Sequence, residues 1–159
     1  MAWLPRHVSR DPTGGFLTRF PKPERELLRA LPGRLRDELL APDGDAGVHR
    51  LFPPAHREDP EIAERYRELV HADLVAGRLG AIEVMESTID AEHLDEEQLL
   101  AWMGTVNDLR LILGTRLEVT DDRQDEDLPD DDPRAQAYAL YHYLSQLVEE
   151  MVEALTDLR

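Results

Sequence analysis

Residues 94–117, LDEEQLLAWMGTVNDLRLILGTRL, are the stretch that decides the fold. Asp95 is suited to cap a helix, because its carboxylate can accept hydrogen bonds from backbone N–H groups of the first turn, and Gln98 completes a capping-box pattern. Apolar residues then recur at steps of three and four, which is typical of an amphipathic helix. These residues are Leu99, Trp102, Met103, Val106, Leu109, Leu113 and Leu117. Additional leucines and an isoleucine widen the apolar surface, so we predict a central helix with neighbours on more than one side.

A polar run interrupts the leucines of this helix. It consists of Asn107, Asp108 and Arg110, with Arg116 two turns further on. Polar groups close to a buried surface must find partners, since an unsatisfied one costs about 1–3 kcal/mol. One interpretation is a structural network in which Asp108 pairs with a neighbouring arginine. The other is a pocket for a ligand or partner that uses Asn107, Arg110 and Arg116.

The composition indicates one domain covering residues 1–159 and a highly acidic surface. The net charge is −16, which repels free DNA or RNA unless a local basic patch or a partner intervenes. Arginines gather in the first 36 residues, so we predict Arg6, Arg10 and Arg19 as partner-binding residues. The alternative is that these arginines form ion pairs with the acidic remainder of the chain.

The N-terminus lacks a basic start followed by an apolar run, and no apolar stretch approaches the roughly 18 residues that a membrane span requires. We therefore expect a cytoplasmic protein without a membrane segment. Cysteine is absent, so the chain itself can form no disulfide and no thiolate.

The segments around the central helix predict a mainly α fold, a bundle of about five helices with a small N-terminal β-hairpin. Residues 1–20 predict the hairpin, because a Pro/Gly-rich turn separates two short runs and Phe16, Thr18 and Phe20 share a face. A leucine stripe predicts a helix over 24–40, kinked or split at Pro32. Residues 48–54 predict a short turn that buries Leu51 and Phe52.

A helix is expected from Asp59 and Pro60, as N-cap and first residue, to about Ser87, either continuous or divided near its glycines. Its predicted inner face includes Ile62 and Leu69. Residues 118–132 predict an acidic loop, whose spacing lacks the alternate ligands and glycine of a calcium-binding loop.

The last helix begins after Asp132 at Pro133 and carries a heptad seam. The seam consists of Ala137, Tyr141, Leu144, Val148, Met151, Leu155 and Leu158. It either packs within the bundle or contacts a second subunit or partner helix. On the second interpretation Tyr141, Val148 and Met151 are partner-binding residues, and a homodimer is possible.

Catalytic motifs are missing from the chain. His7, His49, His56, His71, His93 and His142 are scattered, and no metal-ligand spacing, phosphate-binding glycine loop or nucleophile motif is present. We therefore predict no enzyme, no cofactor and no metal site. A small-molecule-binding enzyme built on Asn107, Asp108, Arg110 and Arg116 remains as a third hypothesis.

Several stretches together resemble an actinobacterial family, domain of unknown function number twenty-seventeen. They are residues 16–20 before a leucine-rich helix, LFPPAH at 51–56, NDLRLILGTRL at 107–117, and the Asp-Pro-Arg at 132–134 before the last helix. The resemblance covers nearly the whole chain. Some members are oxidative-stress transcriptional regulators of the AosR type, whose proposed redox switch is a pair of N-terminal cysteines. This chain departs from that pattern, since its first residues, MAWLPRHVSR, contain no cysteine.

The resemblance implies two functional hypotheses. The first is a non-enzymatic transcriptional or stress-response regulator that acts through a protein such as a sigma factor or RNA polymerase. The second is an adaptor or accessory factor in Clp-type regulated proteolysis, because members of the family are often encoded beside the Clp protease adaptor.

Overall fold

The computed structural model describes residues 6–41, 46–49, 51, 60–118, 129 and 131–156. Their elements, in chain order, are β1 (Val8–Arg10), β2 (Phe16–Thr18), α1 (Lys22–Leu40), α2 (Ala46–His49), α3 (Pro60–Ser87), β3 (His93–Leu94), α4 (Glu96–Arg116) and α5 (Pro133–Thr156). This confirms the predicted mainly α fold with an N-terminal hairpin. Phe52, the Asp59 cap and residues 119–128 of the acidic loop lie outside the described residues.

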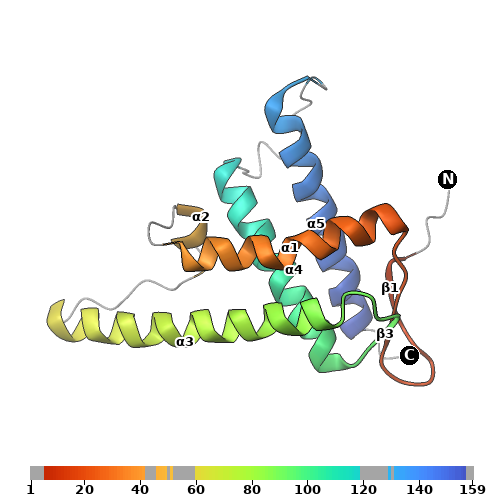
Figure 1. Cartoon of the computed structure of the whole chain (residues 1–159), viewed down its shortest axis with the longest axis horizontal. Coiled ribbons are helices and arrows are strands. Elements are labelled where there is room, and N and C mark those ends of the chain that lie inside the picture. The colour runs from red at the N-terminus through yellow and green to blue at the C-terminus, as the bar shows by residue number, and fades with distance from the viewer. Residues whose placement is uncertain are drawn as a thin grey trace.

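Helix α4 is the centre of the bundle. It packs against α5, α3, α1 and α2, and Figure 1 shows α1 crossing over α4 and α5. The capping box is confirmed, because Asp95 Oδ1 accepts from the Gln98 amide at 2.7 Å and Gln98 Oε1 accepts from the Asp95 amide at 2.9 Å. Leu99, Trp102 and Val106 are fully buried. The helix is thus surrounded on several sides, as its wide apolar surface predicts.

The N-terminal hairpin belongs to a three-stranded antiparallel sheet. Strands β1 and β2 pair with Val8 opposite Thr18, and β2 pairs on its other side with β3, which places Phe16 opposite Leu94. The turn needs glycine at Gly15, where φ is +74° and a Cβ atom would lie 2.9 Å from the Leu94 carbonyl oxygen. Strand β3 was not predicted, because two residues in a connection are too short to show alternation.

Helices α1 and α3 run without interruption through their expected weak points. Helix α1 continues through Pro32, which is buried, so the predicted split does not occur. Helix α3 passes its glycines as one helix of 28 residues and extends beyond the bundle at its N-terminal end (Figure 1). Ile62 and Leu69 in that extension are 66% and 70% exposed, so the predicted inner face is wrong for the first half of α3.

Helix α5 starts at Pro133, as predicted, and buries a face rotated from the expected seam. Its buried residues are Tyr138, Leu144, Leu147, Glu150, Met151 and Ala154. Leu144 and Met151 belong to the heptad positions, whereas Tyr138, Leu147 and Ala154 do not. Because α4 and β1 both pack on α5, its inner face is set by two different neighbours rather than by one seam.

Two glycines of α4 provide a matched test of the α4–α5 packing. A Cβ atom at Gly104 would meet nothing within 4 Å, whereas one at Gly114 would lie 2.9 Å from the Tyr141 ring. We expect Gly104→Ala to raise the free energy of unfolding by about 0.5–1 kcal/mol through helix propensity. In Gly114→Ala the new methyl group must displace the Tyr141 ring, and this cost should cancel the gain in helix propensity. Urea denaturation should therefore show Gly114→Ala to be at least about 1 kcal/mol less stable than Gly104→Ala. Equal stabilisation by both substitutions would contradict this packing.

Candidate functional site

The polar run of α4 begins with an ion pair. The Asp108 carboxylate lies 3.0 Å from Arg78 Nε of α3, and both side chains are mostly buried. Arg78 also donates to the Leu51 carbonyl at 3.0 Å, so it links α3, α4 and the segment after α2. Burial raises the pKa of Asp108 above its usual value, while the charge of Arg78 opposes that rise. Of the two interpretations of the polar run, the structural one includes such a pair between Asp108 and an arginine.

The remaining polar residues of α4 make separate contacts. Arg110 donates to Asn107 Oδ1 at 2.8 and 3.2 Å, one turn away on the same helix. Arg116 forms a two-bond pair with Glu38 of α1, at 2.8 and 2.6 Å. These contacts favour the structural interpretation of the run, because the side chains reach different partners.

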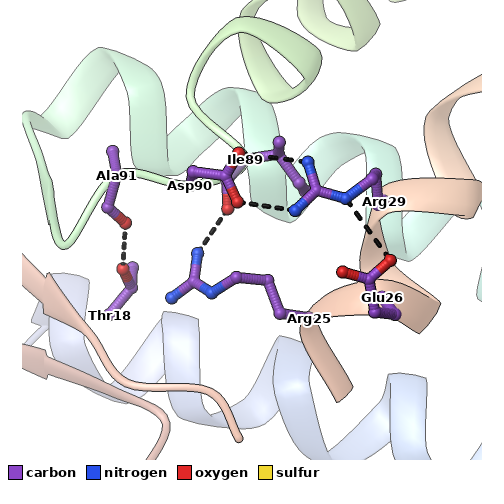
Figure 2. A network of polar contacts seen from close by, with 7 residues as sticks. All are labelled: Thr18, Arg25, Glu26, Arg29, Ile89, Asp90 and Ala91. Carbon is purple, nitrogen blue, oxygen red and sulfur yellow. Dashed lines mark hydrogen bonds and ion pairs between the residues drawn. The ribbon is translucent and has the colours of Figure 1, made fainter. Parts of the chain in front are cut away.

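A second polar network fastens α1 to the connection between α3 and β3. Figure 2 shows Arg29 pairing with both oxygens of Asp90, at 3.1 and 2.6 Å, and Arg25 donating to the Ile89 carbonyl. Thr18 of β2 donates to the Ala91 carbonyl of the same connection. Hydrogen bonds from Arg29 lower the pKa of Asp90. The hairpin, α1 and the α3–β3 connection are therefore held at one end of the bundle.

His7 lies between two carboxylates at this end. Its Nδ1 is 3.0 Å from Glu150 of α5, its Nε2 is 3.1 Å from Glu24 of α1, and its backbone amide also donates to Glu150 at 3.3 Å. The imidazole stacks on Phe20 with a centroid distance of 5.2 Å. Because the carboxylates occupy opposite ring nitrogens, the arrangement binds strand β1 to two helices and does not converge on one point.

Tyr143 of α5 meets the His7 ring edge-on, with centroids 6.2 Å apart. Its hydroxyl oxygen is buried and has no hydrogen-bond partner among the described residues. Burial, together with the nearby Glu24 charge, raises the pKa of Tyr143 above its usual value. The hydroxyl is therefore protonated at neutral pH and faces the Glu24 carboxylate.

An open groove of about 1090 Å³ lies beside the hairpin, and the residues around His7 form one of its walls. We call it the hairpin groove; it is lined by Arg6, His7, Leu17, Thr18, Arg19, Phe20, Pro21, Glu24, Arg25, Asp90, Glu92, His93, Tyr143 and Gln146. It contains arginines and carboxylates side by side. The same lining also includes the apolar side chains of Leu17, Phe20 and Pro21, so charged groups and apolar surface lie next to each other.

The three predicted partner-binding arginines lie at this end but differ in their contacts. Arg6 pairs with Glu153 of α5 at 2.7 Å, and Arg10 donates to the Leu155 carbonyl at 3.2 Å while lying over the Phe16 ring. Both help to dock the hairpin on α5. The Arg19 guanidinium is exposed, and within the described part of the chain it has no partner. Arg19 is thus the arginine of this set that is available to another molecule.

The three predicted partner-binding residues of α5 also differ in how far they are buried. Met151 is fully buried in the core, so its side chain contacts this chain's own interior. Val148 is partly buried against the same core, and Tyr141 is half-buried beside Gly114. Val152, which is 43% exposed, presents more apolar surface than any of them. Among the described residues of α5, Val152 is therefore the most exposed large apolar side chain.

Sequence reasoning did not find the contacts of His7 and Tyr143. His7 and Glu150 are 143 residues apart, and no local pattern connects them. The sequence offers two signals. Glu150 lies among the apolar residues of the last helix, and His7 lies at the predicted first strand. Either becomes meaningful only after the hairpin is placed on α5.

Two further findings concern the described ranges. Within them, no group of three or more histidine, aspartate or glutamate side chains is arranged to hold a metal ion. None of the helices there is long and apolar enough to cross a membrane.

Comparisons with known proteins identify the family. The chain is 31% identical over 133 residues to proteins of Mycobacterium tuberculosis and Mycobacterium bovis that are both named oxidative stress regulator AosR. These matches cover 73% of this chain and 61% of the relatives, so the chain spans less than two thirds of their length. No solved structure shows a significant match. The profile of Domain of unknown function (DUF2017) matches residues 5–155, and the chain therefore belongs to that family.

Proposed function

We propose that this chain is a non-enzymatic regulator of a stress response that acts by binding a protein partner through the hairpin groove. The observation that carries the proposal is the exposed Arg19 guanidinium beside a mixed-charge groove of about 1090 Å³. Relatives named oxidative stress regulators support the regulatory role. Charged groups at the edge of an interface steer association and select partners, which is what a regulator requires.

On this proposal the partner is a protein of the transcription machinery, such as a sigma factor or RNA polymerase. A net charge of −16 opposes direct contact with DNA. A protein that binds DNA has to offer positive charge to the phosphates, and this chain is negative overall. A local basic residue acts only over about 8–10 Å at physiological salt. Arg19 can therefore contact an acidic side chain of a protein while the chain as a whole stays away from nucleic acid.

The input to such a regulator differs from thiol oxidation. The chain contains no cysteine, so an oxidant cannot close a disulfide within it. The N-terminal hairpin of this chain is held to α5 by non-covalent contacts. Arg6, His7 and Arg10 each bind α5 directly. On this proposal the hairpin is docked without a redox step.

Charge reversal at Arg19 tests the proposed surface. We expect Arg19→Glu to weaken binding to the partner about tenfold, mainly by slowing association, because a rim charge affects the rate of encounter. Lys22→Glu is the matched control, since Lys22 is an exposed cation at the start of α1 that does not line the groove. The measurement is biolayer interferometry of the full chain against actinobacterial RNA polymerase holoenzyme and isolated sigma factors at 0.15 M salt.

Three results would contradict the proposal. Equal effects of the two substitutions would remove the hairpin groove as the binding surface. Tight sequence-specific binding to DNA by the chain alone would overturn the protein-mediated mechanism. Co-purification with Clp components and with no transcription protein would favour an adaptor in regulated proteolysis instead.

A further inference from the structure

A cavity that is open to solvent on one side, and that shares only Tyr143 with the lining of the hairpin groove, lies among α1, α4 and α5. Its volume is about 570 Å³, within the range of about 300–1,000 Å³ that is usual for small-molecule sites. It is formed where α1 crosses the C-terminal half of α4 and the N-terminal half of α5 (Figure 1). Most of its lining is aliphatic, including Leu27, Leu31, Leu109, Leu113, Leu140 and Leu144.

The cavity is elongated along one face of α1. Leu27, Leu31, Arg34 and Glu38 line it at helical spacing, which spans about 16 Å at 1.5 Å per residue. Its charged residues gather at one end, where Arg116 of α4 pairs with Glu38. The opposite end, around Leu27, Leu140 and Tyr143, has no charged residue in its lining. An occupant would therefore have one polar end and a long apolar body.

The charge of the polar end is positive. The charged lining residues are Arg34, Glu38 and Arg116, and the last two neutralise each other. The Arg34 guanidinium is exposed, and no described side chain or carbonyl pairs with it. A carboxylate is the group that matches an arginine fork best, because it can accept two parallel hydrogen bonds.

The surroundings favour a small molecule over a partner helix. The most exposed large apolar side chains of the described residues are Leu27, Leu40, Ile62, Leu69, Leu100 and Val152. Of these only Leu27 borders the cavity, so the apolar surface does not continue beyond it. A stable protein interface buries about 800 Å² on each partner and needs such a continuation.

We propose that this cavity binds an amphipathic monocarboxylate, with its carboxylate on Arg34 and its aliphatic chain along the leucines of α1, α4 and α5. Such a ligand contacts three helices at once and thereby stabilises their crossing. Burial of the chain supplies most of the affinity, and the head group supplies the selectivity. This inference does not depend on the partner or on the hairpin groove.

Calorimetric titration of the full chain with dodecanoate, below its micelle concentration and at 0.15 M salt, tests the inference. We expect saturable one-to-one binding of dodecanoate, weaker binding of dodecanol and the weakest binding of dodecyltrimethylammonium. Arg34→Glu should lower the affinity for dodecanoate about tenfold, since it reverses the charge that faces the head group. Arg19→Glu makes the same charge change outside the cavity and should leave the affinity unchanged.

A cavity-filling variant separates this site from unspecific binding. Ala137 lines the cavity and is only half-buried, so Ala137→Trp should fill it and abolish binding of all three probes while circular dichroism retains the helical signal. The inference is overturned by the absence of saturable binding, by equal affinity for the anionic and cationic probes, or by binding that survives Ala137→Trp.

Discussion

Replacing Arg78 with methionine should lower the free energy of unfolding by about 3–5 kcal/mol at neutral pH, because it leaves the buried Asp108 carboxylate without a counter-charge. The pair is 3.0 Å apart, and both side chains are mostly enclosed. The substitution also removes the donor to the Leu51 carbonyl. Asp108→Asn should cost only about 1 kcal/mol, since an amide carries no charge to desolvate and Arg78 keeps its bond to Leu51.

The loss of unfolding free energy caused by Arg78→Met should depend on pH, and the protonation of Asp108 determines the direction of that dependence. Burial raises the pKa of Asp108 above its ordinary 3.8, so the folded chain holds this proton more tightly than the unfolded chain. The protonated carboxyl of Asp108 therefore stabilises the folded chain at low pH. This stabilisation is lost as the pH rises through the pKa that Asp108 has in the folded chain. Removing Arg78 raises that pKa further, since the opposing charge is gone. The difference from the wild type should therefore shrink between pH 7 and about pH 5.

Urea denaturation at both pH values measures these effects, and a double variant provides the control. Arg78→Met combined with Asp108→Leu removes both charges and should be at least about 1.5 kcal/mol more stable than Arg78→Met alone. If the single and double variants are equally stable, the cost of Arg78→Met comes from lost packing and the lost bond to Leu51 rather than from an unpaired carboxylate. A loss that is constant with pH would lead to the same conclusion.

The features predictable from sequence are those whose causes are local. The capping box at Asp95 and Gln98 depends on groups three residues apart, and it is found where expected. The start of α5 at Pro133 likewise follows from the absent N–H of proline, which suits a first helical turn. The pairing of Asp108 was predictable because a carboxylate on a buried face requires a cation, although sequence could not name Arg78.

The features that sequence could not supply depend on which elements meet. The exposed Ile62 and Leu69 have the spacing of an inner face, but the first half of α3 extends beyond the helices that would cover it. Met151 has the spacing of a partner seam, yet it is fully buried in the bundle core. The cavity proposed as a ligand site combines residues from α1, α4 and α5, and of the predicted polar run only Arg116 reaches it.

Trp102→Ala should lower the free energy of unfolding by about 3–5 kcal/mol and loosen the hairpin together with the core. The indole is fully buried, donates through Nε1 to Thr88 Oγ1 at 2.7 Å and stacks on Phe20 with a centroid distance of 6.1 Å. Phe20 stacks in turn on His7, so a row of three rings connects α4 to the N-terminal strand. Urea denaturation followed by circular dichroism measures the global loss.

Hydrogen exchange tests whether this loss reaches the hairpin, and Trp102→Phe is the matched control. Phenylalanine keeps a ring against Phe20 but cannot donate to Thr88, so it should cost about 1–2 kcal/mol and leave the hairpin protected. The informative amides are Thr18, which donates to the Glu92 carbonyl at 2.9 Å, and Arg19, which donates to the His7 carbonyl at 2.7 Å. In Trp102→Ala they should exchange faster relative to the amides of α5 than they do in Trp102→Phe. If their relative protection is the same in both variants, the row of rings does not transmit stability from α4 to the hairpin. The docking of β1 then depends on its polar contacts with α1 and α5, which include those of His7 with Glu150 and Glu24.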